Sequence, residues 1–376
     1  MKILVGDILK SKAQTLVNTV NCVGIMGKEI ALEFKNRFPE MFKDYVQRCN
    51  RNEVRVGQPY LYRSLFGQQI VNFPTKEHWK SISKVSDVEN GMDYLLGHYK
   101  IWGITSIAIP PLGCGNGQLD WKVVGPLIYK RAKQMTIPVE VYAPYGTNPA
   151  ELTESFLENA GDTAIVGRNG YKSGQIPFNP AWVGLVEILY RIENQPYHWP
   201  VGRIVFQKIA YVATQQGLPT GFNYQKSSYG PFSKELKPAE AKLINNNLLQ
   251  EQRLGRMFEI KVGTNFNESR RRYNSLLEKY TPIIEKTADL FMRVDTTQAE
   301  ILATVIFTAT SLKQKSKSTI SETDVLEAVM QWKQRRHPPL GKASVASAIR
   351  NLGMLHWLDV QPDNKLPVSE ESEVYV

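Results

Sequence analysis

Residues 107–121 read IAIPPLGCGNGQLDW. A short apolar run leads into a loop with three glycines at alternate positions, and an Asp precedes the apolar start of a helix. Glycines at this spacing let the backbone approach a bulky anion, and successive amides can form a nest around it. Asp120 is expected to be the N-cap of the helix that begins at Trp121. The stretch therefore predicts a strand, an anion-binding loop and a helix.

The same alternation extends over residues 1–150. Short β-branched runs predict strands at 3–5, 15–20, 69–73, 106–110 and 139–143, and apolar periodicity predicts helices around 88–99 and 121–135. Strands that alternate with helices favour an α/β fold with a mostly parallel or mixed sheet covered on both sides. Ligands then belong at the carboxyl ends of the strands.

A second glycine loop lies upstream, where residues 17–34 read VNTVNCVGIMGKEIALEF. A strand runs into a glycine-bearing loop and then a helix, and exposed amides at a helix start suit phosphate. The spacing matches neither the dinucleotide fingerprint nor the Walker loop. Taken alone, the pattern favours a tight strand-to-helix turn.

Bulk composition is that of a globular protein. The chain has 376 residues, 42% apolar and 22% charged, which favours two or three domains. Three scattered Cys argue against a disulfide framework, and no metal site is expected. No signal peptide is expected after Met1, and the apolar stretch at 301–312 is too short and polar to span a bilayer. We expect a cytoplasmic protein without membrane contact.

The net charge of +10 is unevenly distributed. Residues 1–150 hold 19 Lys and Arg against 12 Asp and Glu, whereas the rest of the chain holds 27 against 24. The excess in the first part fits a polyanionic partner. A solvated basic surface explains it equally well.

Glycine and proline punctuation divides the chain. We expect a domain at 1–150, a linker at 151–178 after one helix near 149–160, a mainly helical domain at 179–362 and a polar tail at 363–376. Helices are expected at 182–192, 204–216, 267–293, 298–313 and 321–332. The last begins with a capping box, Ser321 to Asp324.

With the two glycine loops and the Gly6-Asp7-Ile8 strand end, the first 145 residues resemble a macrodomain. The resemblance implies ADP-ribose as ligand, with Asp7 and Ile8 at adenine, Asn21 at the distal ribose and the glycine loops at the pyrophosphate. In isolation, Asp7 and Asn21 are each better explained as turn residues. The full set of contacts that the resemblance implies is Asp7, Ile8, Asn18, Met26, Gly27, Lys28, Leu112, Gly113, Cys114, Gly115, Asn116 and Gly117.

Residues 72–80, NFPTKEHWK, narrow the resemblance to a hydrolase branch that includes the DarG antitoxins and a human enzyme that removes ADP-ribose from glutamate. The resemblance implies that Lys80 is catalytic without a cofactor, and it leaves Asn21 or a bound water to act with it. A loop amine has two possible roles: it stabilises charge that develops on the leaving group, or it attacks the opened sugar as a Schiff-base nucleophile. Without the family, a solvated charge is the favoured interpretation of Lys80.

One departure bears on the substrate. The glutamate-specific relatives pair their Lys with an Asp in the glycine loop, and that position is Gly117 here, with Asp120 out of register. His78 and Trp79 are candidates for stacking on a DNA base, although a Trp that only seats its loop is the commoner case. The resemblance therefore implies hydrolysis of ADP-ribose on thymidine in single-stranded DNA. The alternatives are a hydrolase of modified protein side chains and a non-catalytic ADP-ribose reader fused to a DNA-binding regulator.

The second half agrees in layout with these antitoxins, in which a helical region binds the cognate DarT toxin. Three short motifs, at 206–211, 217–219 and 229–232, resemble those of a helical module in other toxin-neutralising proteins. A helix face followed by a turn explains them almost equally well. Residues 334–337 and 341–359 are an alternative DNA reader, although a solvated helix end is favoured for 334–337.

Overall fold

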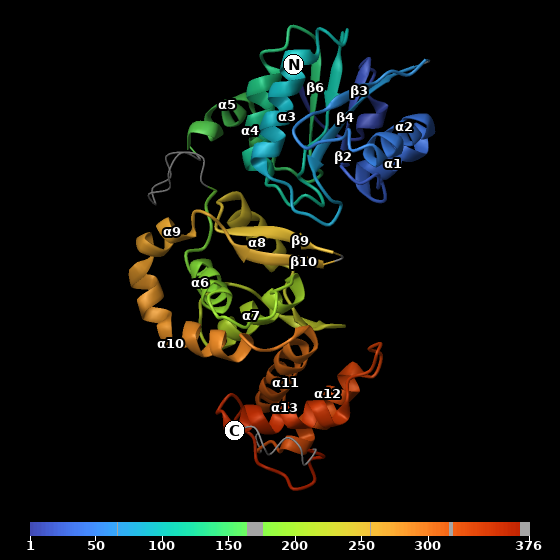
Figure 1. Cartoon of the computed structure of the whole chain (residues 1–376). Helices are drawn as coiled ribbons and strands as arrows, with labels where there is room; N and C mark the ends of the chain where they lie inside the picture. Colours follow the sequence, from blue (N-terminus) through green and yellow to red (C-terminus); the bar gives the residue numbers. More distant parts are fainter. Residues whose placement is uncertain (66, 164–175, 256, 316–318, 369–376) are drawn as a thin grey trace. The chain divides into compact units, whose positions relative to one another are not determined.

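The computed structural model describes residues 1–65, 67–163, 176–255, 257–315 and 319–368. It comprises two compact units (Figure 1): the first contains Met1–Pro177 and Glu240–Asn246, and the second contains Phe178–Ala239 and Asn247–Val376. The predicted linker and tail lie in part outside the described residues, at 164–175 and 369–376.

The first unit is built on a six-stranded sheet in the order β1-β6-β5-β2-β4-β3. All neighbouring strands run parallel except β3, which is antiparallel to β4. The strands are β1 (Lys2–Val5), β2 (Thr15–Asn21), β3 (Tyr60–Tyr62), β4 (Gln69–Lys76), β5 (Ile107–Ile109) and β6 (Val139–Ala143). The sequence did not predict β3, because its residues Tyr-Leu-Tyr include none of the β-branched residues on which the other strands were predicted.

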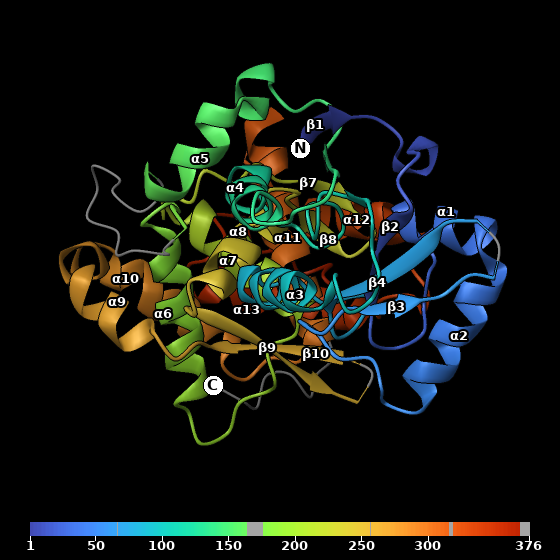
Figure 2. The same cartoon turned by 90° about the horizontal axis from the view of Figure 1, so that it is seen from above.

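Helices cover both faces of this sheet (Figures 1 and 2). Successive residues of β2 point to opposite faces. Leu16 is buried with residues of α1 and α2, and Val17 with residues of α3 and α4. The helices are α1 (Glu29–Arg37), α2 (Pro39–Asn50), α3 (Val85–His98) and α4 (Trp121–Ala132), and α5 (Glu154–Thr163) packs on α4. The predicted α/β fold, a mixed sheet between helices, is confirmed.

The chain enters α4 as the sequence predicted. The Asp120 carboxylate accepts a hydrogen bond from the Lys122 N–H at 3.0 Å and so caps the helix. Asp120 is therefore committed to a structural role. Two short 3₁₀ helices, η1 (Ile8–Lys10) and η2 (Pro149–Leu152), complete the first unit.

The second unit is mainly helical, as predicted. Its helices are α6 (Trp182–Glu193), α7 (Arg203–Gln215), α9 (Phe266–Arg272), α10 (Asn274–Phe291), α11 (Thr296–Lys315), α12 (Glu322–Lys333) and α13 (Lys342–Met354), and α8 (Leu236–Asn245) is divided between the two units. Two antiparallel hairpins accompany them: β7 (Gln225–Ser227) with β8 (Gly230–Phe232), and β9 (Leu249–Leu254) with β10 (Met257–Val262).

The capping box at Ser321 and Asp324 is confirmed. The single helix expected at 267–293 is wrong, because Tyr273 ends α9 and precedes α10 with a non-helical φ of −103° and ψ of 22°. The solvated helix end expected at 334–337 is wrong for Arg336, whose side chain is 13% exposed and ion-paired with Glu300. Among the described residues, no helix is long and apolar enough to cross a bilayer.

Candidate active site

The predicted site residues follow strands whose carboxyl ends lie at one edge of the sheet (Figure 1). Strands β1, β6, β5, β2 and β4 are parallel, so the chain leaves each of them on the same side. Asp7 follows β1, Asn21 ends β2, Lys80 follows β4 and the glycine loop follows β5. The topology therefore brings the predicted residues to one edge.

Backbone hydrogen bonds tie two pairs of these loops together. The Cys22 N–H, after β2, donates to the Glu77 carbonyl, after β4, at 3.0 Å. The Ser83 N–H, beyond Lys80, donates to the Gly117 carbonyl of the glycine loop, also at 3.0 Å. The Lys80 loop is thus held between the two glycine loops.

The carboxylate of Glu29 joins the remaining two loops, the one after β2 and the glycine loop after β5. The Asn116 N–H donates to both oxygens of Glu29 at 3.1 Å, and a Cβ on Gly115 would lie 2.5 Å from them. Glu29 is the first residue of α1 and has a φ of +52°, a conformation that is strained for a residue with a side chain. Its carboxylate therefore occupies the glycine loop as an anion would. Sequence reasoning missed Glu29, and the available signal was an acidic residue in the first turn of a helix that follows a glycine loop.

Two glycines of the loop, Gly113 and Gly117, are required by space. Gly113 has a φ of +74°, and a Cβ there would lie 2.7 Å from the Leu119 side chain. A Cβ on Gly117 would lie 2.4 Å from both the Gly113 carbonyl oxygen and the Ser83 hydroxyl. At Gly117 this loop therefore has no room for a side chain.

Asn21 organises the loop after β2. Its Oδ1 accepts from the Val23 N–H at 2.9 Å and from the Tyr45 hydroxyl at 3.0 Å, and its Nδ2 donates to the Ile25 carbonyl at 2.6 Å. The side chain is 5% exposed. Burial raises the pKa of Tyr45, so the phenol remains a neutral donor. In this conformation Asn21 therefore shapes the loop.

Asn18 and Met26 are buried beneath the same loop. Asn18 Nδ2 donates to Asn72 Oδ1 on β4 at 3.0 Å and lies 3.8 Å from the Met26 sulfur. Asn18 is 0% exposed and Met26 is 2% exposed, whereas Gly27 and Lys28 are exposed. Asn18 and Met26 thus form the floor of the loop, and their predicted ADP-ribose contacts stay predictions.

Asp7 and Ile8, which are predicted to lie at the adenine, and the thiols of the two glycine loops have the following surroundings. Asp7 is exposed at the end of β1 and its Oδ1 caps η1 by accepting from the Leu9 N–H at 3.0 Å, while Ile8 is buried. Leu112 is buried beneath the glycine loop. Burial raises the pKa of the Cys22 thiol and of the Cys114 thiol to about 12, so neither is a thiolate at neutral pH.

Lys80 lies in an exposed aromatic loop. Its ammonium is 5.0 Å from the centre of the Trp79 ring, a cation–π contact. The His78 ring stacks on the Trp79 ring, with 5.5 Å between the ring centres. The His78 Nδ1 accepts from the Lys80 N–H at 3.1 Å and so fixes the turn. Trp79 is 43% exposed. Among the residues that the structure describes, Lys80 forms no ion pair, and no three His, Cys, Asp or Glu side chains are grouped as metal ligands.

Residues 17–128 match the Macro domain family. Together with the sheet order and the loops at its edge, this match shows that the N-terminal unit has the macrodomain fold.

The chain is a homologue of proteins named DNA ADP-ribosyl glycohydrolase. It is 34% identical to the one from Mycobacterium tuberculosis over 245 residues, which is 62% of this chain and 64% of the relative. A Thermosipho africanus protein named DNA ADP-ribosyl transferase–DNA ADP-ribosyl glycohydrolase fusion protein is 36% identical over 162 residues, 38% of this chain and 42% of the relative. The solved macrodomain of Mycobacterium tuberculosis DarG is 42% identical, covering 38% of this chain and 97% of that one, with a TM-score of 0.37. The match thus spans less than two thirds of the curated relatives.

Proposed function

We propose that the macrodomain removes ADP-ribose from thymidine in single-stranded DNA, and that residues 179–362 bind and neutralise a cognate DarT-type toxin that adds it. The chain is then the antitoxin of a pair, and its hydrolase activity is a form of DNA repair in the cytoplasm.

The observation that carries the hydrolase proposal is the joining of the three loops. Lys80 lies in a loop that is bonded through Glu77 to the loop after β2 and through Ser83 to the glycine loop. Those two loops hold the residues that the family places at the distal ribose and the pyrophosphate. An ADP-ribose seated in the glycine loop therefore has its reacting end near Lys80, which is the positioning that catalysis needs.

The reaction breaks the bond between the anomeric carbon of the distal ribose and the base. Water supplies a hydroxyl to the carbon and a proton to the base. Two routes are open to Lys80: its ammonium stabilises the charge that develops on the departing base, or its free amine attacks the anomeric carbon of the opened sugar, and water then hydrolyses the imine. Both polar atoms of the Asn21 side chain already have hydrogen-bond partners in the loop. Asn21 therefore contributes by holding the loop in shape, or it contacts the anomeric carbon after its amide group exchanges one of these partners for the substrate.

Three features favour DNA over a protein carboxylate as the carrier of ADP-ribose. The names of the relatives include DNA ADP-ribosyl glycohydrolase. The glycine loop leaves no space for the Asp of glutamate-specific enzymes at Gly117. Trp79 is 43% exposed and lies beside a lysine, a combination on which a single-stranded base could stack.

The test is release of ADP-ribose from an oligonucleotide that carries ADP-ribosyl-thymidine, with a glutamate-linked ADP-ribosyl peptide assayed beside it. We expect release from DNA and much slower release from the peptide. Lys80→Ala should abolish release, while Lys84→Ala, which removes an exposed lysine four residues along, should not. Borohydride added during turnover separates the two routes, because it traps an imine on Lys80 and leaves the electrostatic route without an adduct.

Toxin neutralisation is tested with the same variant. The fused transferase and glycohydrolase of the Thermosipho africanus relative supports a functional pairing of the two activities. If residues 179–362 sequester the toxin, the Lys80→Ala chain still co-purifies with it and still blocks new modification of DNA. Loss of both effects in that variant would assign neutralisation to hydrolysis alone.

A further inference from the structure

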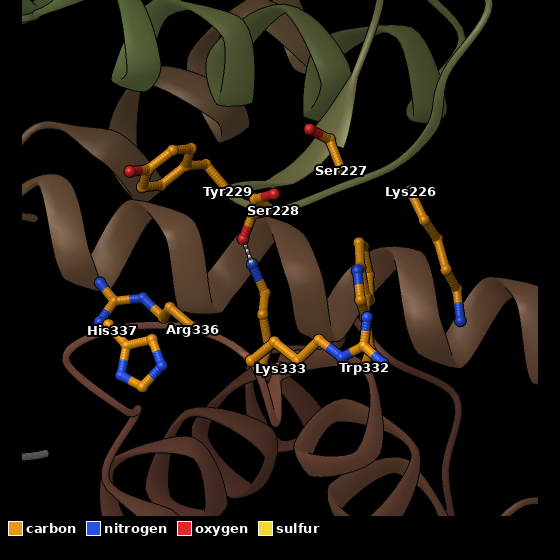
Figure 3. A pocket seen from close by; sticks show the side chains of 9 residues that line it. Lys226, Ser227, Ser228, Tyr229, Trp332, Lys333, Arg336 and His337 are labelled. Carbon is orange, nitrogen blue, oxygen red and sulfur yellow. Dashed lines mark hydrogen bonds between the residues drawn. The ribbon is translucent and has the colours of Figure 1, made fainter.

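The second unit contains a pocket to which neither proposed activity assigns a role (Figure 3). Its volume is about 570 Å³, within the range of ligand-binding cavities. The β7–β8 hairpin forms one wall, and the end of α12 with the residues after it forms the other. The lining residues are Lys226, Ser227, Ser228, Tyr229, Trp332, Lys333, Arg335, Arg336 and His337.

The wall of the pocket contains more buried cations than carboxylates. Lys333 Nζ donates to Glu300 Oε1 at 2.7 Å and to the Ser228 carbonyl at 2.8 Å, as Figure 3 shows for Ser228. Arg336 donates to the other oxygen of Glu300 at 3.1 Å. Behind them Lys208, 2% exposed, donates to the Pro231 carbonyl at 2.8 Å. Among the described residues, Glu300 is the carboxylate that these cations share, so positive charge is left over.

The effect on Lys208 agrees with this imbalance. Burial and the neighbouring Lys333 lower the pKa of Lys208 to about 8. Burying cations without matching carboxylates costs free energy, and such sites gain most from an anionic ligand.

Two more cations are exposed at the pocket. Lys226 places its ammonium 4.9 Å from the centre of the Trp332 ring. Neither Lys226 nor Arg335 forms an ion pair with any residue that the structure describes. Both are therefore available to a phosphate.

Aromatic side chains accompany the charges. Tyr229 is 56% exposed, and Figure 3 shows Tyr229 and Trp332 on either side of Lys333. Trp332 packs against Phe307 at 5.4 Å, which leaves Tyr229 as the ring with an open face. Phosphate-binding cations beside an open aromatic ring are the features that bind single-stranded nucleic acid without sequence readout.

We propose that this pocket binds a segment of single-stranded DNA, with the backbone phosphates at Lys226 and Arg335 and a base stacked on Tyr229. An acidic peptide would also pair with the cations, but it would not require an open aromatic ring such as Tyr229. Binding here requires no ADP-ribose, so it is independent of the proposed hydrolase activity.

The test is fluorescence anisotropy of a labelled, unmodified thymidine oligonucleotide with the full-length chain over a range of salt concentrations. Lys226→Glu/Arg335→Glu should weaken binding at least about tenfold, and the slope of log affinity against log salt should fall by about 1.4 for two lost phosphate contacts on a single strand. Tyr229→Ala should weaken binding roughly fivefold or more without changing that slope. The control, Lys237→Glu/Lys279→Glu, makes the same charge change at exposed lysines outside the pocket.

Melting temperature and ADP-ribose affinity, both equal to wild type, check that the pocket variants are folded. Wild-type-like DNA binding by both pocket variants would overturn the proposal, as would no DNA binding by the wild-type chain. A loss of toxin binding with retained DNA binding would also overturn it and would assign the pocket to a protein partner. The same oligonucleotide as RNA distinguishes DNA preference from general single-strand binding.

Discussion

The macrodomain and the second unit each prepare a place for an anion, but with different parts of the chain. In the macrodomain the backbone does so: Asn116 presents its amide from the glycine loop, in which Gly117 leaves no room for a side chain, and beneath the loop after β2 the neutral side chains of Asn18 and Asn72 bond to each other. In the second unit side-chain cations do so, around the carboxylate of Glu300. The first site should therefore respond most to steric changes and the second to changes of charge.

The largest effect is expected from the buried charge. Glu300→Gln leaves Lys333 and Arg336 without their carboxylate, and it should lower the free energy of unfolding of the second unit by about 3–5 kcal/mol. Urea unfolding followed by tryptophan fluorescence measures this. Glu285→Gln is the matched control, because Glu285 is 54% exposed and its pair with Arg191 should contribute no more than about 1 kcal/mol. Equal effects of the two changes would contradict the assignment.

The pH dependence of stability tests Lys208. Burial lowers its pKa from 10.5 to about 8, so between these values the unfolded chain holds a proton that the folded chain has lost. The contribution of Lys208 to stability should therefore rise with pH in this window, by up to about 1.4 kcal/mol per pH unit, and stay constant below pH 8. Subtracting the profile of Lys208→Met removes the other titrating groups. A difference that is flat from pH 8 to 10 would show that Lys208 is not perturbed.

The macrodomain loop should respond to a single methyl group. Gly117→Ala places a Cβ 2.4 Å from the Gly113 carbonyl oxygen, and the resulting shift should cost about 1–3 kcal/mol and weaken ADP-ribose binding. Calorimetric titration with ADP-ribose measures the loss. Gly97→Ala on α3 meets no atom within 4 Å, so it should leave the affinity unchanged.

The smallest effect concerns Glu29. Its carboxylate accepts the hydrogen bond of the Asn116 N–H. Glu29→Ala should therefore free this N–H for the ligand and tighten ADP-ribose binding about fivefold, the equivalent of one hydrogen bond of about 1 kcal/mol. Glu33→Ala, at an exposed position on the same helix, is the control. Weaker binding by the Glu29 variant would mean that this carboxylate closes the loop over the ligand instead of competing with it.

Local patterns made the macrodomain predictable. The glycine spacing at 113–117, the cap at Asp120 and the strand alternation all depend on near neighbours in the sequence. The bonds that join the loops do not: Ser83 to Gly117 and Glu29 to Asn116 link segments far apart in the chain.

The second unit was predictable only in outline, for the same reason. Its longer helices follow apolar periodicity, but hairpins with strands of three residues, such as β7 and β8, carry no periodic signal. The burial of Lys333 depends on Glu300, 33 positions away on another helix. Helical spacing gave no reason to expect a buried lysine there.

The most direct test of the central claim is a single-turnover assay of ADP-ribose release from thymidine-modified single-stranded DNA. We expect the wild-type chain and Lys84→Ala to release ADP-ribose at similar rates, and Lys80→Ala to slow release by at least about 100-fold. Undiminished release by Lys80→Ala, or no release by the wild-type chain, would contradict it.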